Sequence, residues 1–292
     1  MMQQAIAKTE VLIEALSYIR SFSGKLIVVK LGGSAMDNEE SLACAMDDLA
    51  FLQAVGIRPV VIHGGGPAIS KEMKRQGKEP VFAHGRRITD SETMRIVEEV
   101  LVNVINSHIV ELLHALHVPA KGLHVRNSRP LEGRRIPPVD TPEGPVDLGR
   151  VGEVTCVNVA AIRQYADQGV IPVIAPIAVD EGGEVLNVNA DSAAAKVAGE
   201  LRSAKLVFVS DTHGIYTKAE DRSSLASTLH GDEIERLIRS GVIDGGMLPK
   251  VEGCLDAVKS GVGKAHIIDG RIRHSLLLEI FTEEGIGTEV LL

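Results

Sequence analysis

Lys30 lies at the end of the apolar segment KLIVVKL, and Gly32 and Gly33 follow it almost directly. A lysine at the end of a buried strand needs an anionic partner, because a charge removed from water is costly unless it is paired. Glycines in the next turn expose backbone N–H groups and let a ligand approach the chain closely. The segment is therefore a candidate site for a phosphate or carboxylate group.

Two other glycine-rich segments share this arrangement. One is HGGG, which begins at His63, and the other is GGMLPK, which ends at Lys250. Each is expected where a strand or loop runs into a helix, whose N-terminus carries partial positive charge that favours anions. None of the three segments matches G-x-x-x-x-G-K-[ST] or G-x-G-x-x-G, which argues against a Walker-type nucleotide site and a standard dinucleotide fold. Each segment taken singly is also consistent with a tight turn.

A fourth polar segment, NVNAD, runs from Asn187 to Asp191. Asn and Asp favour turns and helix N-termini, so this segment by itself is consistent with a turn and a cap for the helix that follows. Turns and caps are a poor explanation for all four segments in one chain. Their combination favours a binding site for anions.

The hydrophobic pattern predicts alternating strands and helices around these segments. Strands are expected at KLIVVKL, IRPVVIH, KGLHV, VIPVIAPIAV, KLVFVSD and KAHIID. Helices are expected at 2–22, 39–55, 91–117, 158–168, 232–240 and 249–260 and at SAAAKVAGEL. The Pro- and Gly-rich stretch 131–157 predicts hairpins, and DEGGEVLNVNAD predicts another. This alternation predicts an α/β fold: a three-layer α/β/α sandwich with a mainly parallel central sheet and added β-hairpins.

The composition argues against several classes of function. A net charge of −8 disfavours nonspecific binding of nucleic acid. No apolar run approaches the roughly 18 residues that a membrane helix needs. Cys44, Cys156 and Cys254 are far apart and form no C-x-x-C pair, so neither a disulfide framework nor a zinc site is expected. We expect a cytoplasmic protein that binds a small anion, with no nucleic-acid or membrane partner.

In their order along the chain, these segments resemble the amino-acid kinase superfamily and, within it, the N-acetylglutamate kinases. The motifs that carry the resemblance are VVKLGGSAM, VVIHGGGPAI, GRRITD, DLGRVGEV, LNVNAD, VSDTHGIY, GGMLPKVEGCLDAV and HIIDG. The resemblance implies an amino-acid kinase fold over residues 25–292. Within it, a substrate-binding lobe at 25–178 precedes a nucleotide-binding lobe at 179–292, and a helical extension occupies residues 1–24.

The resemblance implies transfer of the γ-phosphoryl group of ATP to the side-chain carboxylate of N-acetyl-L-glutamate, in arginine biosynthesis. A carboxylate is already ionised at pH 7, so this reaction needs no general base. It needs cations that bring two anions together and neutralise charge in a loose transition state. In the family pattern, Lys30 and Lys250 flank the phosphoryl group, and Asp191 lies between them and holds both ammonium groups. The amides of Gly32 and Gly33 would face the same group.

The resemblance also implies residues for two binding sites. Arg87 and Asn187 would hold the α-carboxylate of N-acetyl-L-glutamate, a task that suits the guanidinium fork of an arginine. The other implied substrate residues are Gly64, Gly65, Gly66 and Asn189. The implied nucleotide residues, besides Gly32 and Gly33, are Ser210, Asp211, Gly214, Tyr216, Gly246 and Met247. No protein ligand for a metal is implied, and Mg²⁺ would be carried by the ATP phosphates.

Two residues depart from the family pattern. Arg86 stands where a bulky apolar residue usually precedes the family arginine, so Arg86 is an alternative to Arg87, although the spacing to Ile88 and Thr89 favours Arg87. Ser34 replaces a common asparagine and leaves the substrate open. A kinase for another acidic N-modified amino acid, such as a 2-aminoadipate derivative, is therefore one alternative. A catalytically silent arginine-sensing protein is another, although sensing would not need both lysines and the aspartate.

Residues 1–22 resemble the N-terminal helix of arginine-inhibited N-acetylglutamate kinases, in which paired helices join dimers into a hexameric ring. The resemblance implies a homo-oligomer, either a dimer or a hexamer, and an arginine site between this helix and the C-terminal lobe. Tyr18, His266 and Glu279 match positions associated with that effector. A carboxylate for the guanidinium and an aromatic ring for its flat face suit arginine. The alternative is a helix that only covers the sheet of its own subunit.

Overall fold

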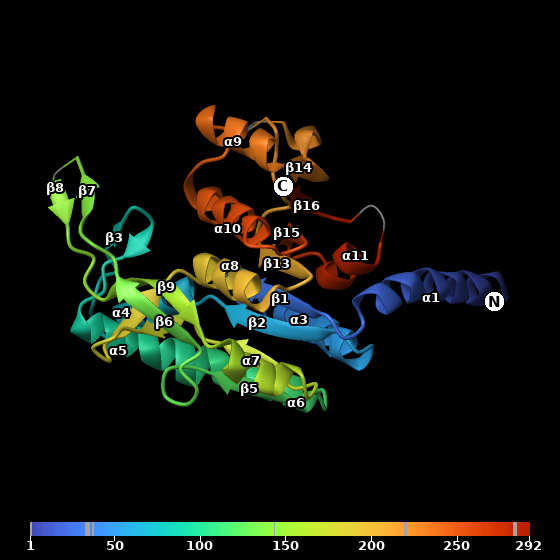
Figure 1. Cartoon of the computed structure of the whole chain (residues 1–292), viewed down its shortest axis with the longest axis horizontal. Coiled ribbons are helices and arrows are strands. Elements are labelled where there is room, and N and C mark those ends of the chain that lie inside the picture. Colours follow the sequence, from blue (N-terminus) through green and yellow to red (C-terminus); the bar gives the residue numbers. More distant parts are fainter. Residues whose placement is uncertain (1, 33–35, 37, 143, 219–220, 283–284) are drawn as a thin grey trace.

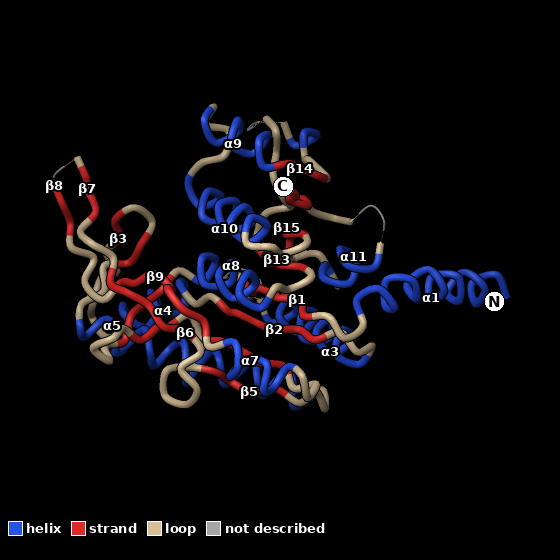
Figure 2. Tube along the Cα trace, in the orientation of Figure 1, coloured by secondary structure: helices blue, strands red, loops and turns tan. Residues whose placement is uncertain are grey.

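The computed structural model of the chain describes all residues except 1, 33–35, 37, 143, 219–220 and 283–284. At its centre is an eight-stranded sheet, drawn in red in Figure 2. Neighbouring strands are parallel except β15 and β16, which are antiparallel. In order across the sheet, the strands are β14 (Thr228–His230), β16 (Thr288–Leu291), β15 (Lys264–Asp269), β13 (Lys205–Ser210), β1 (Leu26–Leu31), β2 (Arg58–His63), β10 (Ile171–Ile174) and β5 (Ala120–Leu123).

Helices cover both faces of this sheet (Figure 1). Every residue of β1 is buried, which is typical of a parallel strand covered on both sides. Leu26 and Val28 pack in a cluster with helices of one layer, and Ile27 and Val29 pack with those of the other. The first layer contains α7 (Val159–Ala166), α8 (Ala190–Leu201), α9 (Gly231–Arg239) and α10 (Leu248–Lys259), and the second contains α3 (Glu39–Ala54), α6 (Ser107–Ala115) and α11 (Ser275–Phe281). The predicted three-layer α/β/α sandwich is confirmed.

Four further strands form a small closed barrel beside the sheet. They are β6 (Leu131–Arg135), β9 (Val151–Val157), β11 (Ile177–Val179) and β12 (Val185–Val188). Two short hairpins project from the same end of the molecule: β3 (Phe82–Ala83) with β4 (Arg86–Arg87), and β7 (Val139–Thr141) with β8 (Gly144–Val146). The hairpins predicted within 131–157 are confirmed.

The segment VIPVIAPIAV, which we expected as one strand, forms two. β10 belongs to the central sheet and ends at Ile174, whereas β11 begins at Ile177 and belongs to the barrel. Pro176 lies between them and has no N–H group to donate to a sheet, so the ladder cannot continue through it. The interruption carries the chain from the central sheet into the barrel.

The stretch expected as a single helix at 91–117 is helical but not uniform. It begins as α5 (Ser91–Glu98), continues as the π-helix η1 (Glu99–Asn106), and ends as α6. A π-helix closes i→i+5 hydrogen bonds and often marks a functional site. Apolar spacing does not distinguish this wider turn from an α-helix, so the sequence does not reveal it.

The first helix, α1 (Met2–Phe22), extends away from the rest of the molecule (Figure 1). Among the side chains of α1 that the structure describes, those in its last turns, at Tyr18, Ile19 and Phe22, pack against the cluster that contains α3 and α11. Ile6 and Ile13 are exposed. The alternative in which this helix merely covers its own sheet is therefore wrong for most of its length.

Several elements were not predicted individually. They include α4 (Gly66–Arg75), which follows the triple glycine, the C-terminal elements α11, β14 and β16, and two short 3-10 helices, η2 (Arg222–Ser224) and η3 (Gly245–Met247). Within the described residues, no helix is both long and apolar enough to cross a membrane.

Candidate active site

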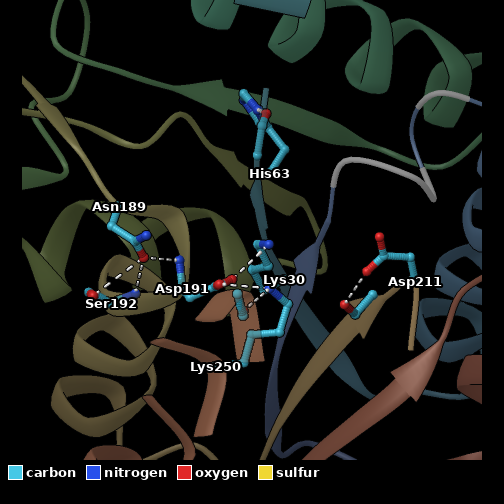
Figure 3. A network of polar contacts seen from close by, with 10 residues as sticks. Lys30, His63, Asn189, Asp191, Ser192, Asp211 and Lys250 are labelled. Carbon is cyan, nitrogen blue, oxygen red and sulfur yellow. Dashed lines mark hydrogen bonds and ion pairs between the residues drawn. The ribbon is translucent and has the colours of Figure 1, made fainter. Parts of the chain in front are cut away.

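Lys30, Asp191 and Lys250 converge from three elements at the C-terminal end of β1 (Figure 3). Lys30 is on β1, Asp191 is in the first turn of α8, and Lys250 is in the first turn of α10. Lys30 Nζ lies 2.7 Å from Asp191 Oδ1, and Lys250 Nζ lies 3.4 Å from Asp191 Oδ2. Each oxygen of one carboxylate thus has its own ammonium group.

The electrostatics of this triad favour an ionised Asp191 with positive charge in excess. Burial disfavours the charged carboxylate, but the ammonium groups of Lys30 and Lys250 outweigh it and hold the pKa of Asp191 below its usual range. The position of Asp191 at the N-terminus of α8 adds to this stabilisation. Two cations and one anion leave a net positive charge, which can attract a further anion.

Gly32 provides room beside Lys30 rather than a free donor. Its N–H donates to Val209 O at 2.8 Å. A β-carbon on Gly32 would lie 2.7 Å from that oxygen and 3.4 Å from Lys30 Nζ. The expectation that the Gly32 amide faces the phosphoryl group is therefore wrong for this structure, because the amide is already bonded. Gly33, like Ser34, lies outside the described residues.

Gly64, Gly65 and Gly66 line a cavity next to Lys30 and Asp191. The N–H of Gly64 donates to Leu31 O at 2.9 Å, so this amide is also engaged. Gly65 caps helix α4, and Gly66 is its first residue. The N-terminus of α4 therefore borders the cavity, and its partial positive charge favours an anion there.

Arg87 brings a buried guanidinium to the same cavity, with 6% of its surface exposed. Its Nη2 donates to Gly66 O at 3.0 Å and to Ser70 Oγ at 2.8 Å, and the guanidinium lies 4.7 Å from the centre of the Phe82 ring. Burial lowers the pKa of Arg87, although a guanidinium remains charged at pH 7. It has no carboxylate partner among the described residues, and a buried cation without one is suited to bind an anionic ligand.

Asn187 and Asn189 border the cavity as expected, but each also has a structural contact. Asn187 Nδ2 donates to Thr89 Oγ1 at 3.3 Å. Asn189 Oδ1 accepts from the backbone N–H groups of Asp191 and Ser192, both at 2.9 Å, and so caps α8 (Figure 3). The cap that we considered for this segment is present, and it fixes the position of Asp191.

The cavity has a volume of about 240 Å³, somewhat below the range of drug-sized sites. Lys30 and Asp191 contribute to its lining, as do the two arginines of the β4 strand. Arg86 thus lines the cavity together with Arg87, so the structure brings both candidates to one site. Only Arg87 is buried.

Sequence analysis missed Phe82 and Thr89 at this site. Phe82 stacks on Arg87, and Thr89 Oγ1 both accepts from Asn187 and donates to Arg87 O at 2.8 Å. Thr89 is fully buried. The motif GRRITD contained Thr89, but nothing in a sequence shows that its hydroxyl joins Arg87 and Asn187, two candidate substrate residues that are far apart in the chain.

The residues expected for the nucleotide lie around the C-terminal end of β13 and the start of α10. Ser210 ends β13, and its hydroxyl donates to Asp211 Oδ1 at 3.1 Å (Figure 3). Gly246 and Met247 are in η3, immediately before α10. Gly246 O accepts from Lys250 Nζ at 3.3 Å, so Lys250 links this region to Asp191.

The other two nucleotide candidates form the turn after β13. Gly214 has a φ of +145°, and a β-carbon there would lie 2.5 Å from Thr288 Oγ1, so only glycine fits. Tyr216 pairs with Leu225 through an isolated bridge. None of the nucleotide candidates that the structure describes, Gly32 included, lines the 240 Å³ cavity. They form a separate region joined to it through Lys250.

Tyr18, His266 and Glu279 line a second cavity of about 560 Å³, between α1 and the C-terminal elements. His266 Nδ1 donates to Glu279 Oε1 at 2.6 Å, and Glu279 Oε2 accepts from the backbone of Ile286 at 2.8 Å. Burial raises the pKa of Glu279, but these hydrogen bonds outweigh it and the pKa is lowered overall. Burial also lowers the pKa of His266, while its hydrogen bond to Glu279 opposes this change. The structure thus brings these three residues together.

Known proteins match both the sequence and the fold. The profile of the Amino acid kinase family matches residues 25–269. The chain is 47% identical to an acetylglutamate kinase from Thermoanaerobacter pseudethanolicus over 98% of this chain and 93% of the relative.

The chain also matches structures of N-acetylglutamate synthase from Neisseria gonorrhoeae. The complex with coenzyme A and N-acetyl-glutamate has 27% identity, a TM-score of 0.83, and coverage of 97% of this chain and 63% of that one. The complex with coenzyme A and L-arginine has 26% identity, a TM-score of 0.82, and coverage of 97% and 65%.

Proposed function

Because the chain belongs to the amino acid kinase family and matches acetylglutamate kinases over almost its whole length, we propose that Lys30, Asp191 and Lys250 are its phosphoryl-transfer centre. The enzyme phosphorylates the side-chain carboxylate of N-acetyl-L-glutamate with ATP and Mg²⁺. It forms N-acetyl-L-glutamyl 5-phosphate, in arginine biosynthesis. The observation that carries the assignment is the buried Asp191 carboxylate with a lysine on each oxygen, at 2.7 and 3.4 Å.

The acceptor needs no deprotonation in this reaction. An ionised carboxylate oxygen of the substrate forms a bond to the γ-phosphorus of ATP, and the bond from that phosphorus to the bridging oxygen breaks to release ADP. Two unit charges about 4 Å apart repel by about 4 kcal/mol at an effective dielectric constant of about 20. Lys30 and Lys250 offset this repulsion. Asp191 holds their ammonium groups in place before the substrates bind, which avoids reorganisation during the reaction.

In this proposal Arg87 anchors the other end of the substrate. Its guanidinium binds the α-carboxylate, while Phe82 and Ser70 hold the guanidinium plane. Asn187 and Asn189 contribute polar groups to the same cavity, and Gly65 and Gly66 contribute the N-terminus of α4. Anchoring the α-carboxylate directs the side-chain carboxylate toward Lys30.

The nucleotide would lie along the second region. Ser210, Asp211, Gly214 and Tyr216 would border its adenosine, and Gly246 and Met247 would border its phosphates next to Lys250. Both oxygens of Asp191 face lysines, so we expect no metal ligand at this carboxylate, and Mg²⁺ would be carried by the phosphate oxygens of ATP. When bound, it neutralises phosphate charge. We propose a substrate-binding lobe at 25–178 and a nucleotide-binding lobe at 179–292, after an extension at 1–24, with Asn187 and Asn189 reaching from the second lobe into the substrate cavity.

Trapping of the acyl phosphate with hydroxylamine tests this function. The purified enzyme with ATP and Mg²⁺ is given N-acetyl-L-glutamate, glutamate, aspartate or N-acetyl-2-aminoadipate in parallel. We expect a hydroxamate from N-acetyl-L-glutamate at a kcat/KM at least about a hundredfold above that of the other acids, because one methylene or one lost polar contact has effects of this size. A preference for the aminoadipate derivative would favour the alternative substrate. No hydroxamate from any acid would favour a silent sensor.

We also propose that arginine binds the second cavity and inhibits the enzyme. Glu279 would bind the guanidinium and Tyr18 would lie against its flat face. His266 is hydrogen-bonded to Glu279 and so fixes the position of this carboxylate. The L-arginine complex of the related synthase supports the proposal. Inhibition by arginine that is lost in Tyr18→Ala is the expected result, and an enzyme insensitive to arginine would contradict it.

A homo-oligomer, a dimer or a hexamer, is part of this proposal. Exposed Ile6 and Ile13 on the projecting part of α1 form an apolar surface that a second copy of this helix would cover. We expect the full chain to sediment as a hexamer and a chain that begins at residue 25 as a dimer. We place the enzyme in the cytoplasm, which the three unpaired cysteines support.

A further inference from the structure

Behind the triple glycine lies a pair of buried polar side chains that the reaction above does not use. His63 is fully buried at the end of β2, and Asn106 is 2% exposed at the end of η1. The two residues are 43 positions apart in the sequence. Burying polar groups costs free energy unless hydrogen bonds satisfy them, so a pair retained here needs an explanation.

The hydrogen bonds of the pair define a single arrangement of protons. His63 Nδ1 lies 2.8 Å from Gly64 O, which can only accept, so Nδ1 carries the proton. His63 Nε2 is then an acceptor, and Asn106 Nδ2 donates to it at 3.1 Å. The second hydrogen of Asn106 Nδ2 is donated to Val173 O at 2.9 Å. A reversed amide would set its oxygen against Val173 O, so this orientation is determined.

His63 does not act as an acid or base near neutral pH. Burial lowers its pKa to about 4, the hydrogen bond to Gly64 opposes this change, and the nearby charge of Lys30 lowers the pKa further. The imidazole is therefore a neutral, rigid spacer at pH 7. Figure 3 shows it next to Lys30, above the triad.

The π-helix and two glycines fit around this pair. A β-carbon on Gly65 would lie 2.5 Å from Leu101 and 2.8 Å from Ile105, both on η1, so the glycine loop rests directly on this helix. A β-carbon on Gly122 of β5 would collide with Asn106 Oδ1, so the amide lies flat on that strand. The wide turn of η1 ends at Asn106. Its side chain thus connects β5, β10 and the glycine loop.

We propose that His63 and Asn106 are positioning residues that hold the Gly64–Gly66 loop at a fixed distance from Lys30. The peptide groups of Gly64 are held from two sides: its N–H donates to Leu31 O, next to Lys30, and its C=O accepts from His63. Asn106 holds the imidazole in the one orientation that donates to Gly64. The role rests on the proposed function, since the loop and Lys30 border the site of phosphoryl transfer.

Two substitutions of His63 separate its two hydrogen bonds. His63→Asn retains an N–H close to the position of Nδ1, and His63→Gln instead reaches the position of Nε2. We expect His63→Asn to keep kcat within about threefold of wild type and His63→Gln to lower it about tenfold, with KM for ATP within about twofold in both. Equal kcat values in the two variants would overturn the positioning role, because a packing role does not depend on which bond remains.

Asn106→Asp and Asn106→Leu give an independent readout. Aspartate at this position places a carboxylate beside His63 Nε2, which raises the pKa of the imidazole toward neutrality and adds a positive charge near Lys30. We expect kcat of Asn106→Asp to vary between about pH 6 and pH 8, while Asn106→Leu is slower than wild type without this added dependence. Parallel pH profiles in both variants would contradict the account.

Nitrogen NMR of wild type labelled at histidine tests the geometry without turnover. The His63 signals are assigned by comparison with His63→Asn. We expect them to show the neutral Nδ1–H tautomer from about pH 5.5 to about pH 8, a range that begins about 1.5 units above the pKa of about 4. A titration in that range or the Nε2–H tautomer would overturn the proposal. An inactive wild type would overturn the proposed function and the positioning role together, whereas an active wild type with equal His63 variants would overturn the positioning role alone.

Discussion

Asp191 and Glu279 are both buried carboxylates with a lowered pKa, but different groups keep them ionised. Asp191 lies between the ammonium groups of two lysines. Glu279 is held by His266, whose pKa is lowered, and by backbone N–H groups, which carry no net charge. The Asp191 triad has positive charge in excess and suits an anion, whereas Glu279 has no lysine or arginine within ion-pair distance among the described residues and can meet a cation, although Lys205 and Lys264 also line its cavity.

The comparison shows that burial of an acid does not by itself indicate its role. In the first cavity, the acid is a support, and the lysines and Arg87 are the groups that would meet ligands. In the second, the proposed ligand is a guanidinium and Glu279 itself would meet it. The identity of the hydrogen-bond partners, and not the pKa direction, distinguishes the two sites.

Removal of a triad lysine is expected to have the largest effect. Lys30→Ala should lower kcat by about three orders of magnitude, because one cation at the transferring phosphoryl group is lost. The measurement is the initial rate of hydroxamate formation, with circular dichroism to check folding. Lys196→Ala, on the exposed face of α8, is the matched control. Near-normal turnover in a folded Lys30→Ala enzyme would contradict the role of the triad.

Arg87→Lys tests the other end of the first cavity. A lysine keeps the charge but lacks the planar fork, so we expect KM for N-acetyl-L-glutamate to rise about thirtyfold while kcat changes about threefold or less. Arg86→Lys is the matched comparison on the same strand and should change KM much less. The opposite result would assign the α-carboxylate to Arg86.

Glu279→Gln tests the second cavity. The amide is similar in size but has no charge, so we expect the arginine concentration for half inhibition to rise about tenfold or more. Steady-state rates at increasing arginine give this value. Glu235→Gln, on exposed α9, is the control. Unchanged arginine inhibition in Glu279→Gln would mean that arginine does not bind in this cavity.

The smallest expected effect is on stability in acid. It tests the lowered pKa, the property that Glu279 shares with Asp191. A lowered pKa means that the ionised Glu279 stabilises the folded state above its unfolded pKa, about 4.3, and that this contribution is lost as pH falls through the folded pKa. We therefore expect Glu279→Gln to be less stable than wild type at pH 7, by an amount that shrinks below about pH 4. Urea unfolding at pH 7, 5 and 3.5 measures it. A difference that grows on acidification would contradict the pKa direction.

Much of the fold followed from local pattern in the sequence. Alternating apolar strands and helices predicted the three layers, and the motif segments placed Lys30, Asp191 and Lys250 at element ends that meet in space. The division of VIPVIAPIAV was missed because a buried strand and a strand–turn–strand share the same apolar composition. The π-helix was missed because its hydrogen bonds shift by one residue without a change of pattern.

The details of the site could not be predicted for a different reason. The Gly32 amide is engaged by Val209, and Asn106 reaches His63 and Val173 across separate elements. Such partners are set by how the elements pack and not by neighbouring residues. Sequence motifs therefore predicted which residues form the candidate site, whereas only the structure shows which of their atoms remain available to a ligand.

A double-mutant cycle on Lys30 and Asp191 tests the central claim most directly. The kcat for acyl-phosphate formation is measured for wild type, Lys30→Ala, Asp191→Ala and the double variant. If Asp191 acts by holding the lysines, the second substitution should add little, and the double variant should be within about threefold of the slower single variant. Losses that multiply, with the double variant slower by the product of the two single effects, would mean that the two residues act independently and would contradict the account.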